Sequence, residues 1–297
     1  MQATQIDFLT SEGFKLYGLA YQPSKDKKLA IFIHGAGDSS VIRDGALLAA
    51  LSSELSNKDI DLMTFNNRGS GYVSSIKKYS QSGQVIEKLM AGMAYERIVD
   101  CIADVDAAVD WALKNGYEEI TLIGHSTGAN KAVLYLSPQA GNSKNVVQVF
   151  LLGGGDDISL QNSRIKNPAR YLKSVKSNIA KGNGNRLVPE DDFPGGHPIT
   201  YSSLLEIIEE NSDYDVFPFG RYKDHKNNLF SKIKSIKLPV VAIYGSEDFG
   251  TVITVTEAMK ILKSINRNIE TVVIEGADHG FTGMEVQLAK EIASRVI

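Results

Sequence analysis

Short apolar runs rich in β-branched residues alternate with longer helical patterns along this chain. The runs are nearly continuous in apolar character, which suits strands of a parallel sheet covered on both faces. They comprise residues 29–33, 120–123, 146–152, 240–244 and 270–274. Apolar residues at helical spacing predict helices over 41–57, 96–114, 127–136, 251–265 and 284–296. The alternation predicts an α/β fold with right-handed crossovers and a mostly parallel central sheet flanked by helices.

The first 21 residues follow a different pattern. Residues 6–9 and 14–21 alternate between apolar and polar side chains around Ser11-Glu12-Gly13. This pattern predicts an antiparallel hairpin at one edge of the sheet.

Polar and glycine-rich motifs follow the predicted strands. Because reactive groups in such sheets gather at the carboxyl ends of the strands, we expect these motifs to share one edge. They are Gly35-Ala36-Gly37-Asp38, Asn66-Asn67-Arg68-Gly69, Ser126, Gly153-Gly154-Gly155-Asp156, Glu247-Asp248 and Asp278-His279.

Composition and charge narrow the class of protein. A chain of 297 residues that is 43% hydrophobic and 23% charged can bury one large core. The net charge of −3 gives no general attraction to nucleic acid or to an anionic membrane, so neither is expected as a partner. Residues 1–10 lack a basic flank and a continuous apolar stretch, and no segment approaches the length of a membrane span. The expected location is cytoplasmic.

Residues 156–231 break the alternation and are interpreted as a largely helical cap inserted over the reactive edge. The core of the fold then comprises two parts, 1–155 and 232–297. The first half of the insertion is basic and the second half acidic. Either the two halves neutralise each other, or a few basic groups face the pocket and attract an anionic substrate.

The segment Gly124-His125-Ser126-Thr127-Gly128 joins a predicted strand to a predicted helix. A serine on such a turn is exposed, and the two glycines let the backbone reverse without a side-chain clash. A serine hydroxyl becomes a useful nucleophile once a base takes its proton. This context favours a nucleophilic Ser126.

Together these motifs resemble those of the α/β-hydrolase superfamily, and the resemblance covers nearly the whole chain outside the insertion. The segments that carry it are His34-Gly35-Ala36-Gly37, 66–71, 124–128, Tyr244-Gly245-Ser246-Glu247-Asp248 and 276–281. The resemblance implies that Ser126 is the nucleophile, His279 the general base and Asp248 the carboxylate that orients the imidazole. Glu247, Asp156 and Asp157 are alternative sources of that carboxylate, whereas Asp278 is expected to shape the loop of His279.

The tetrahedral intermediate of acyl transfer needs hydrogen-bond donors aimed at its oxyanion. We expect the backbone N–H groups of Ala36 and Thr127 to supply them. His34 and His125 are expected to pack around the site, and His197 and His225 to be structural or exposed.

No cofactor or metal is expected. Cys101 is the only cysteine, and its position on an apolar helical stripe indicates packing. The histidines and carboxylates lack metal-ligand spacing, and the glycine run at 153–155 lacks the spacing of a phosphate loop.

These residues predict a serine esterase that cleaves a small-molecule carboxylic ester through an acyl-enzyme. The aromatic residues of the insertion either line an acyl or aryl pocket, as in cap-bearing esterases of the feruloyl type, or form the core of the cap. The alternatives are a peptidase or thioesterase with the same residues, and a hydrolase-fold ligand-binding protein without turnover. The oligomeric state is left open.

Overall fold

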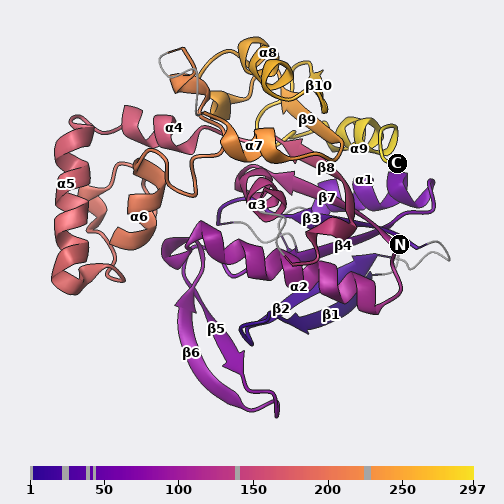
Figure 1. Ribbon diagram of the computed structural model, residues 1–297, viewed down its shortest axis with the longest axis horizontal. Coiled ribbons are helices and arrows are strands. Elements are labelled where there is room, and N and C mark those ends of the chain that lie inside the picture. The colour runs from indigo at the N-terminus through magenta and orange to yellow at the C-terminus, as the bar shows by residue number, and fades with distance from the viewer. Residues whose placement is uncertain (1–2, 22–26, 38–40, 43–44, 138–140, 224–228) are drawn as a thin grey trace.

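The computed structural model describes residues 3–21, 27–37, 41–42, 45–137, 141–223 and 229–297 (Figure 1). Its main sheet has eight described strands in the order β1-β2-β4-β3-β7-β8-β9-β10. The strands are β1 (Ala3–Leu9), β2 (Lys15–Tyr21), β3 (Lys28–Ile33), β4 (Asp61–Asn66), β7 (Glu119–His125), β8 (Val146–Leu152), β9 (Val240–Gly245) and β10 (Ile269–Ile274). Every neighbouring pair from β4 to β10 is parallel, whereas β1–β2 and β2–β4 are antiparallel. The mostly parallel sheet and the N-terminal hairpin are therefore confirmed.

Helices cover both faces of the sheet, as the apolar strands require. On β3, Ile31 and Ile33 face a core shared with α2 (Cys101–Lys114), α3 (Thr127–Leu136) and α8 (Val255–Ile265). Ala30 and Phe32 point to the opposite core, where α1 (Gly45–Ser56) packs against α9 (Glu285–Ala293). No helix in the described part of the chain is long and apolar enough to cross a bilayer.

The predicted helices are present, with shifted ends. The helix predicted over 251–265 begins later, at Val255, because the Thr254 side chain accepts a hydrogen bond from Glu257 N and caps it. A short 3-10 helix, η7 (Phe249–Thr251), occupies the preceding turn. Residues 41–42 lie in a turn ahead of α1.

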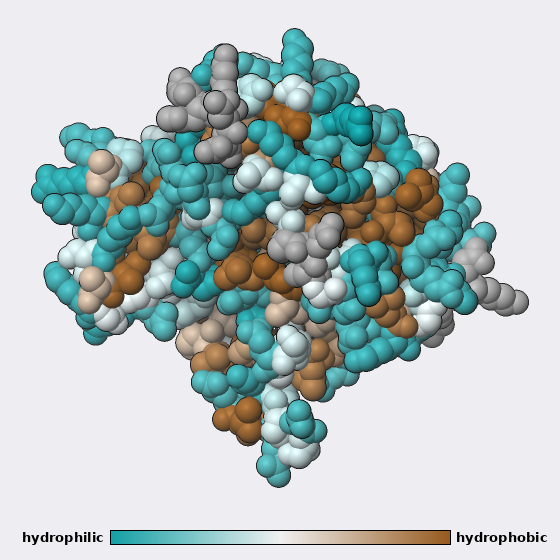
Figure 2. Space-filling view, viewed as in Figure 1, coloured by the Kyte–Doolittle hydropathy of each residue, from teal (hydrophilic) through white to brown (hydrophobic). Residues whose placement is uncertain are grey.

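A two-stranded hairpin of β5 (Ser74–Tyr79) and β6 (Val85–Ala91) was not predicted. It projects from the body of the molecule (Figure 1), and it carries apolar surface (Figure 2), where Val85, Ile86 and Met90 are exposed. Its strands lack a buried apolar face, so the alternation that marks a half-buried strand is missing from the sequence.

Between β8 and β9 the chain forms α4 (Asp157–Ser163), α5 (Pro168–Asn178), α6 (Tyr201–Ile208) and α7 (Ser231–Ser235). The first three lie to one side of the sheet in Figure 1. This region bonds to the segment before α2: Thr200 N donates to Ala94 O at 2.8 Å, and Ile98 N donates to Glu206 Oε2 at 2.9 Å. The helical content matches the expectation, while the boundaries at 156 and 231 stay predictions.

Candidate active site

Ser126 stands on a sharp turn between β7 and α3. Its backbone has φ +55° and ψ −126°, a strained conformation for a residue other than glycine. A Cβ on Gly124 would lie 2.3 Å from Gly128 O, and one on Gly128 would lie 2.0 Å from Ile33 O. The two glycines are needed because the turn packs backbone against backbone, which pushes the serine hydroxyl out at the strand end.

Three side chains distant in sequence meet at this turn. His279 Nε2 lies 2.9 Å from Ser126 Oγ, and His279 Nδ1 lies 2.9 Å from Asp248 Oδ1. Asp248 follows β9 and His279 follows β10, so all three come from the carboxyl ends of parallel strands. The Asp248 side chain has no exposed surface, whereas that of His279 is 21% exposed. The arrangement gives a nucleophile, a base and a buried orienting carboxylate within hydrogen-bond reach.

The surroundings of His279 favour its protonated form. Burial lowers its pKa, but the hydrogen bond and the charge of Asp248 outweigh burial, and the net shift of the pKa is upward from 6.5. Such an imidazole readily accepts a proton from a hydroxyl. The backbone oxygen of His279 is held by His125 Nε2 at 2.9 Å.

Of the candidate carboxylates, Asp248 is the one in hydrogen-bond contact with His279. Glu247 is exposed. Asp156 accepts hydrogen bonds from Ser159 N at 3.0 Å and Gly220 N at 2.8 Å, so its carboxylate caps α4. Asp278 accepts from Thr282 N at 2.8 Å, which lowers the pKa of that carboxyl and holds the loop, as the sequence indicated.

The loop after β3 lies directly against the serine. A Cβ on Gly35 would be 3.0 Å from the Cβ of Ser126. Ala36 and Thr127 border one cavity of about 70 Å³ beside this contact. The N–H of Thr127 belongs to the first turn of α3, where backbone donors have no partner within the helix. The two expected oxyanion donors therefore come from segments that meet at Ser126.

His34 is a neutral, buried support for this loop. Its Nε2 accepts from Asn67 N at 3.2 Å, so its Nδ1 carries the proton and donates to Gly35 O at 2.7 Å. Burial, with a contribution from the charge of Lys131, lowers the pKa of His34 to about 3. His34 thus packs and hydrogen-bonds as expected. His197 is partly buried, and His225 and Asp38 lie outside the described residues.

A buried ion pair beneath the site was not predicted. Lys131 Nζ lies 2.5 Å from Glu96 Oε1, and it also donates to Asn67 Oδ1 at 3.2 Å. The Lys131 side chain has no exposed surface. Its place four residues after Thr127, in a helix whose residues are otherwise mostly apolar, is the sequence signal for a buried charge.

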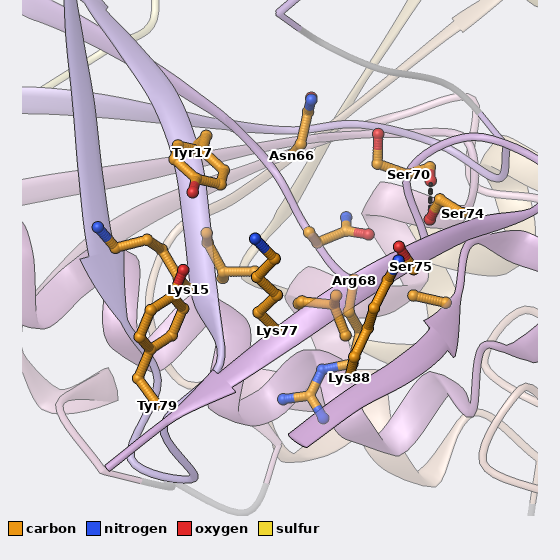
Figure 3. Close-up of a pocket in the computed structure, with 14 residues that line it drawn as sticks. Lys15, Tyr17, Asn66, Arg68, Ser70, Ser74, Ser75, Lys77, Tyr79 and Lys88 are labelled. Atoms are coloured by element: carbon orange, nitrogen blue, oxygen red, sulfur yellow. Dashed lines mark hydrogen bonds between the residues drawn. The ribbon is translucent and has the colours of Figure 1, made fainter. Parts of the chain in front are cut away.

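A larger cavity, of about 360 Å³, lies elsewhere, between β2, the end of β4 and the β5–β6 hairpin (Figure 3). Lys15, Arg68, Lys77 and Lys88 line it. Arg68 is held by Asp104 at 2.8 Å, and Lys15 is paired with Asp7. None of Ser126, Ala36 and Thr127 lines this cavity. The smaller cavity is bordered by Ala36 and Thr127, the two expected oxyanion donors, and is therefore the one next to the candidate reaction site.

Other expected features can be placed. Cys101 is 2% exposed within the core, and burial raises the pKa of its thiol, which agrees with a packing role. Among the described residues no group of histidine, cysteine and carboxylate side chains has the geometry of a metal site.

The eight-stranded sheet with helices on both faces, and the serine turn at the edge where its parallel strands end, define an α/β-hydrolase fold. The chain belongs to the family described as "Protein of unknown function (DUF1749)", which it matches over residues 95–297. A comparison with curated proteins gives no match.

Several solved structures share the fold. Est1E from Butyrivibrio proteoclasticus, in a structure with bound ferulic acid, superposes with a TM-score of 0.64 and 14% identity, covering 97% of this chain and 96% of that one. The Pyrococcus furiosus esterase Pf2001 gives a TM-score of 0.56 and 23% identity, over 99% and 88% of the two chains. The carboxylesterase CesB from Bacillus subtilis gives 0.54 and 14%, over 98% and 90%. At these identities the likeness establishes the fold.

Proposed function

We propose that this protein is a serine hydrolase that cleaves a carboxylic ester through an acyl-enzyme on Ser126. The observation that carries the proposal is the continuous contact from Ser126 Oγ through both nitrogens of His279 to Asp248, with 2.9 Å at each step. The esterase fold of the structural neighbours supports the choice of an ester over a peptide or thioester.

In the first half-reaction Ser126 Oγ attacks the ester carbonyl while His279 Nε2 takes the serine proton. The negative charge that develops on the carbonyl oxygen is stabilised by the N–H groups of Ala36 and Thr127, each worth about 3 kcal/mol of barrier when aligned. The acyl C–O bond then breaks, and the alcohol leaves with the proton from His279.

In the second half-reaction a water molecule gives its proton to His279 and attacks the acyl-enzyme. Collapse of this intermediate releases the acid and returns the proton to Ser126 Oγ. The buried carboxylate of Asp248 stabilises the imidazolium that forms in each half. Neither step needs a metal or a cofactor.

A fluorophosphonate probe tests the nucleophile directly. We expect a covalent mass increase on Ser126 in the wild-type protein and none in Ser126→Ala. Absence of labelling at high probe concentration favours the alternative of a ligand-binding protein without turnover. A panel of matched esters, thioesters and peptides then separates esterase from thioesterase and peptidase activity, because only the leaving group differs between them.

An aryl pocket of the feruloyl type has less support. The aromatic side chains of Phe193, Phe217 and Phe219 are buried in the core, and Tyr214 is the aromatic residue of the insertion that borders the cavity beside Ser126. Measuring the rates of hydrolysis of feruloyl and short-acyl esters will decide between these two substrate groups.

A further inference from the structure

The cavity beside Ser126 is small, and both apolar and polar side chains border it. Ala36 and Thr127 form one side of it, Asp157 and Gln161 from α4 another, and Ser203 and Ile207 from α6 a third. Its volume is about 70 Å³. Since one water molecule needs about 10–15 Å³ of such space, the cavity has room for a chain of a few heavy atoms.

The α4 side presents hydrogen-bond acceptors. Asp157 and Gln161 lie one helical turn apart and therefore share a face. Asp157 Oδ2 accepts a single weak hydrogen bond, from Asn130 Nδ2 at 3.3 Å. Gln161 Oε1 is buried and has no hydrogen-bond partner among the described residues. Buried acceptors of this kind are normally paired, because leaving one unpaired destabilises the folded protein.

Glu96 adds a further unpaired acceptor to the same cavity. It is 5% exposed, its Oε1 is paired with Lys131, and its Oε2 has no hydrogen-bond partner in the described structure. Glu96 belongs to the core rather than to the insertion, so the acceptors come from two separate parts of the chain.

No lysine or arginine is among the described residues that border this cavity. His197 borders it, but burial lowers the pKa of this imidazole and favours its neutral form. Of the two sequence hypotheses for the basic half of the insertion, the anionic substrate therefore finds no support at this cavity. The uncompensated charge here is the carboxylate of Asp157.

We propose that the cavity is an acyl subsite for an ammonium group, so that the preferred substrates are esters of small amino acids in which the amine lies a few bonds from the carbonyl. Asp157 and Gln161 accept the hydrogen bonds of the ammonium group and determine this specificity. The inference rests on the proposed ester hydrolysis at Ser126. The acyl moiety is the part assigned to the cavity because it stays bound beside Ala36 and Thr127 through both half-reactions, whereas the alcohol leaves after the first.

The electrostatics of Asp157 agree with this assignment. Burial, followed by repulsion from Asp156, raises the pKa of Asp157 to about 7. A bound ammonium group removes this penalty by pairing with the carboxylate. A methyl group in the same place leaves the acceptors unpaired.

Three benzyl esters of equal acyl size test the proposal: benzyl β-alaninate, benzyl 3-hydroxypropanoate and benzyl butanoate, which end in ammonium, hydroxyl and methyl groups. Each is hydrolysed by water at the acyl C–O bond, and the benzyl alcohol released is measured. At about pH 8 the amine is protonated. We expect kcat/KM for the ammonium ester to exceed that for the methyl ester by about 10- to 100-fold, with the hydroxyl ester between them.

The variant Asp157→Asn keeps the shape of the side chain and removes its charge, and we expect the ammonium-to-methyl ratio to fall to within about threefold of unity. The control is Asp191→Asn, an exposed acid of the same insertion, for which the ratio is expected to stay at its wild-type value. A general loss of folding lowers both rates and leaves the ratio unchanged, so the ratio reports on specificity alone.

A wild-type ratio near unity, or an unchanged ratio in Asp157→Asn, overturns the inference while leaving ester hydrolysis intact. Failure to hydrolyse any of the three esters, together with the absence of fluorophosphonate labelling of Ser126, overturns the proposed function instead.

Discussion

The variant Asp248→Asn is expected to reduce activity without disturbing the tautomer of His279. Asp248 Oδ1 accepts two hydrogen bonds, from His279 Nδ1 at 2.9 Å and from Gly250 N at 2.7 Å. Because a backbone N–H cannot donate to an amide NH₂ group, Gly250 selects the orientation in which the asparagine oxygen occupies the Oδ1 position. That oxygen still accepts from His279 Nδ1, and His279 Nε2 stays free to take the serine proton.

The amide nitrogen then replaces Asp248 Oδ2, a buried atom without a hydrogen-bond partner in the described structure. The substitution therefore removes a negative charge and little else. Two unit charges about 4 Å apart interact by about 4 kcal/mol at an effective dielectric constant of about 20. A hydrogen bond to a charged group exceeds a neutral one by about 1–2 kcal/mol, which is a second, lower measure of the same electrostatic energy and does not add to it. We expect the barrier to rise by about 2–4 kcal/mol, which is a loss of about 30- to 1,000-fold in kcat/KM.

The assay is the steady-state hydrolysis of a neutral ester by wild-type, Asp248→Asn and Asp278→Asn proteins. Asp278→Asn is the matched control, because Asp278 is adjacent to His279 but exposed, and an asparagine oxygen can still accept from Thr282 N. We expect the control to change kcat/KM by less than about threefold. A loss of about 10,000-fold or more in Asp248→Asn would refute the reasoning, since a loss of that size indicates the wrong tautomer. A loss below about threefold would show that the charge of Asp248 does not act on His279.

Three further predictions follow from the site and its support. Ser126→Ala is expected to lower kcat by about a millionfold, measured with a neutral ester, and a merely tenfold loss would contradict the acyl-enzyme mechanism. The acid limb of the pH–rate profile should have its midpoint above pH 6.5, because His279 acts as a base only when neutral and its pKa is raised above 6.5. Activity then falls as the pH drops through the raised pKa, and a midpoint below pH 6.5 would contradict this assignment. Lys131→Met leaves the charge of Glu96 buried and unpaired, and it should lower the free energy of unfolding by about 3–5 kcal/mol in chemical denaturation. The double variant with Glu96→Gln should regain part of that loss, and equal losses in the single and the double variant would refute the pairing.

The reactive edge could be predicted from the sequence because parallel strands bring their carboxyl ends together. Ser126 and His279 each follow a recognisable apolar run, so their meeting required only the correct order of strands. The choice between Glu247 and Asp248 could not be made in this way. It depends on the turn at Gly250, which directs one of two adjacent carboxylates inward and leaves the other exposed.

The residues that border the cavity beside Ser126 could not be predicted from patterns in the sequence. Asp157 and Gln161 lie on a seven-residue helix of the insertion, and a short helix has too few apolar positions to indicate which face is buried. Glu96, which borders the same cavity, lies 61 residues before Asp157 in the sequence. Tertiary packing alone brings these residues together, as it also places the β5–β6 hairpin away from the body.

The ion pair of Lys131 and Glu96 joins parts of the molecule that would otherwise be able to loosen independently. Lys131 lies on the helix that starts at the nucleophile, and Glu96 lies in the segment to which the insertion is bonded through Ala94 and Ile98. Ser126 and the insertion that borders its cavity are thus both connected to this buried ion pair. We therefore expect Ser126 and the cavity beside it to unfold as one cooperative unit. An interaction that stabilises one of them against unfolding would then also stabilise the other.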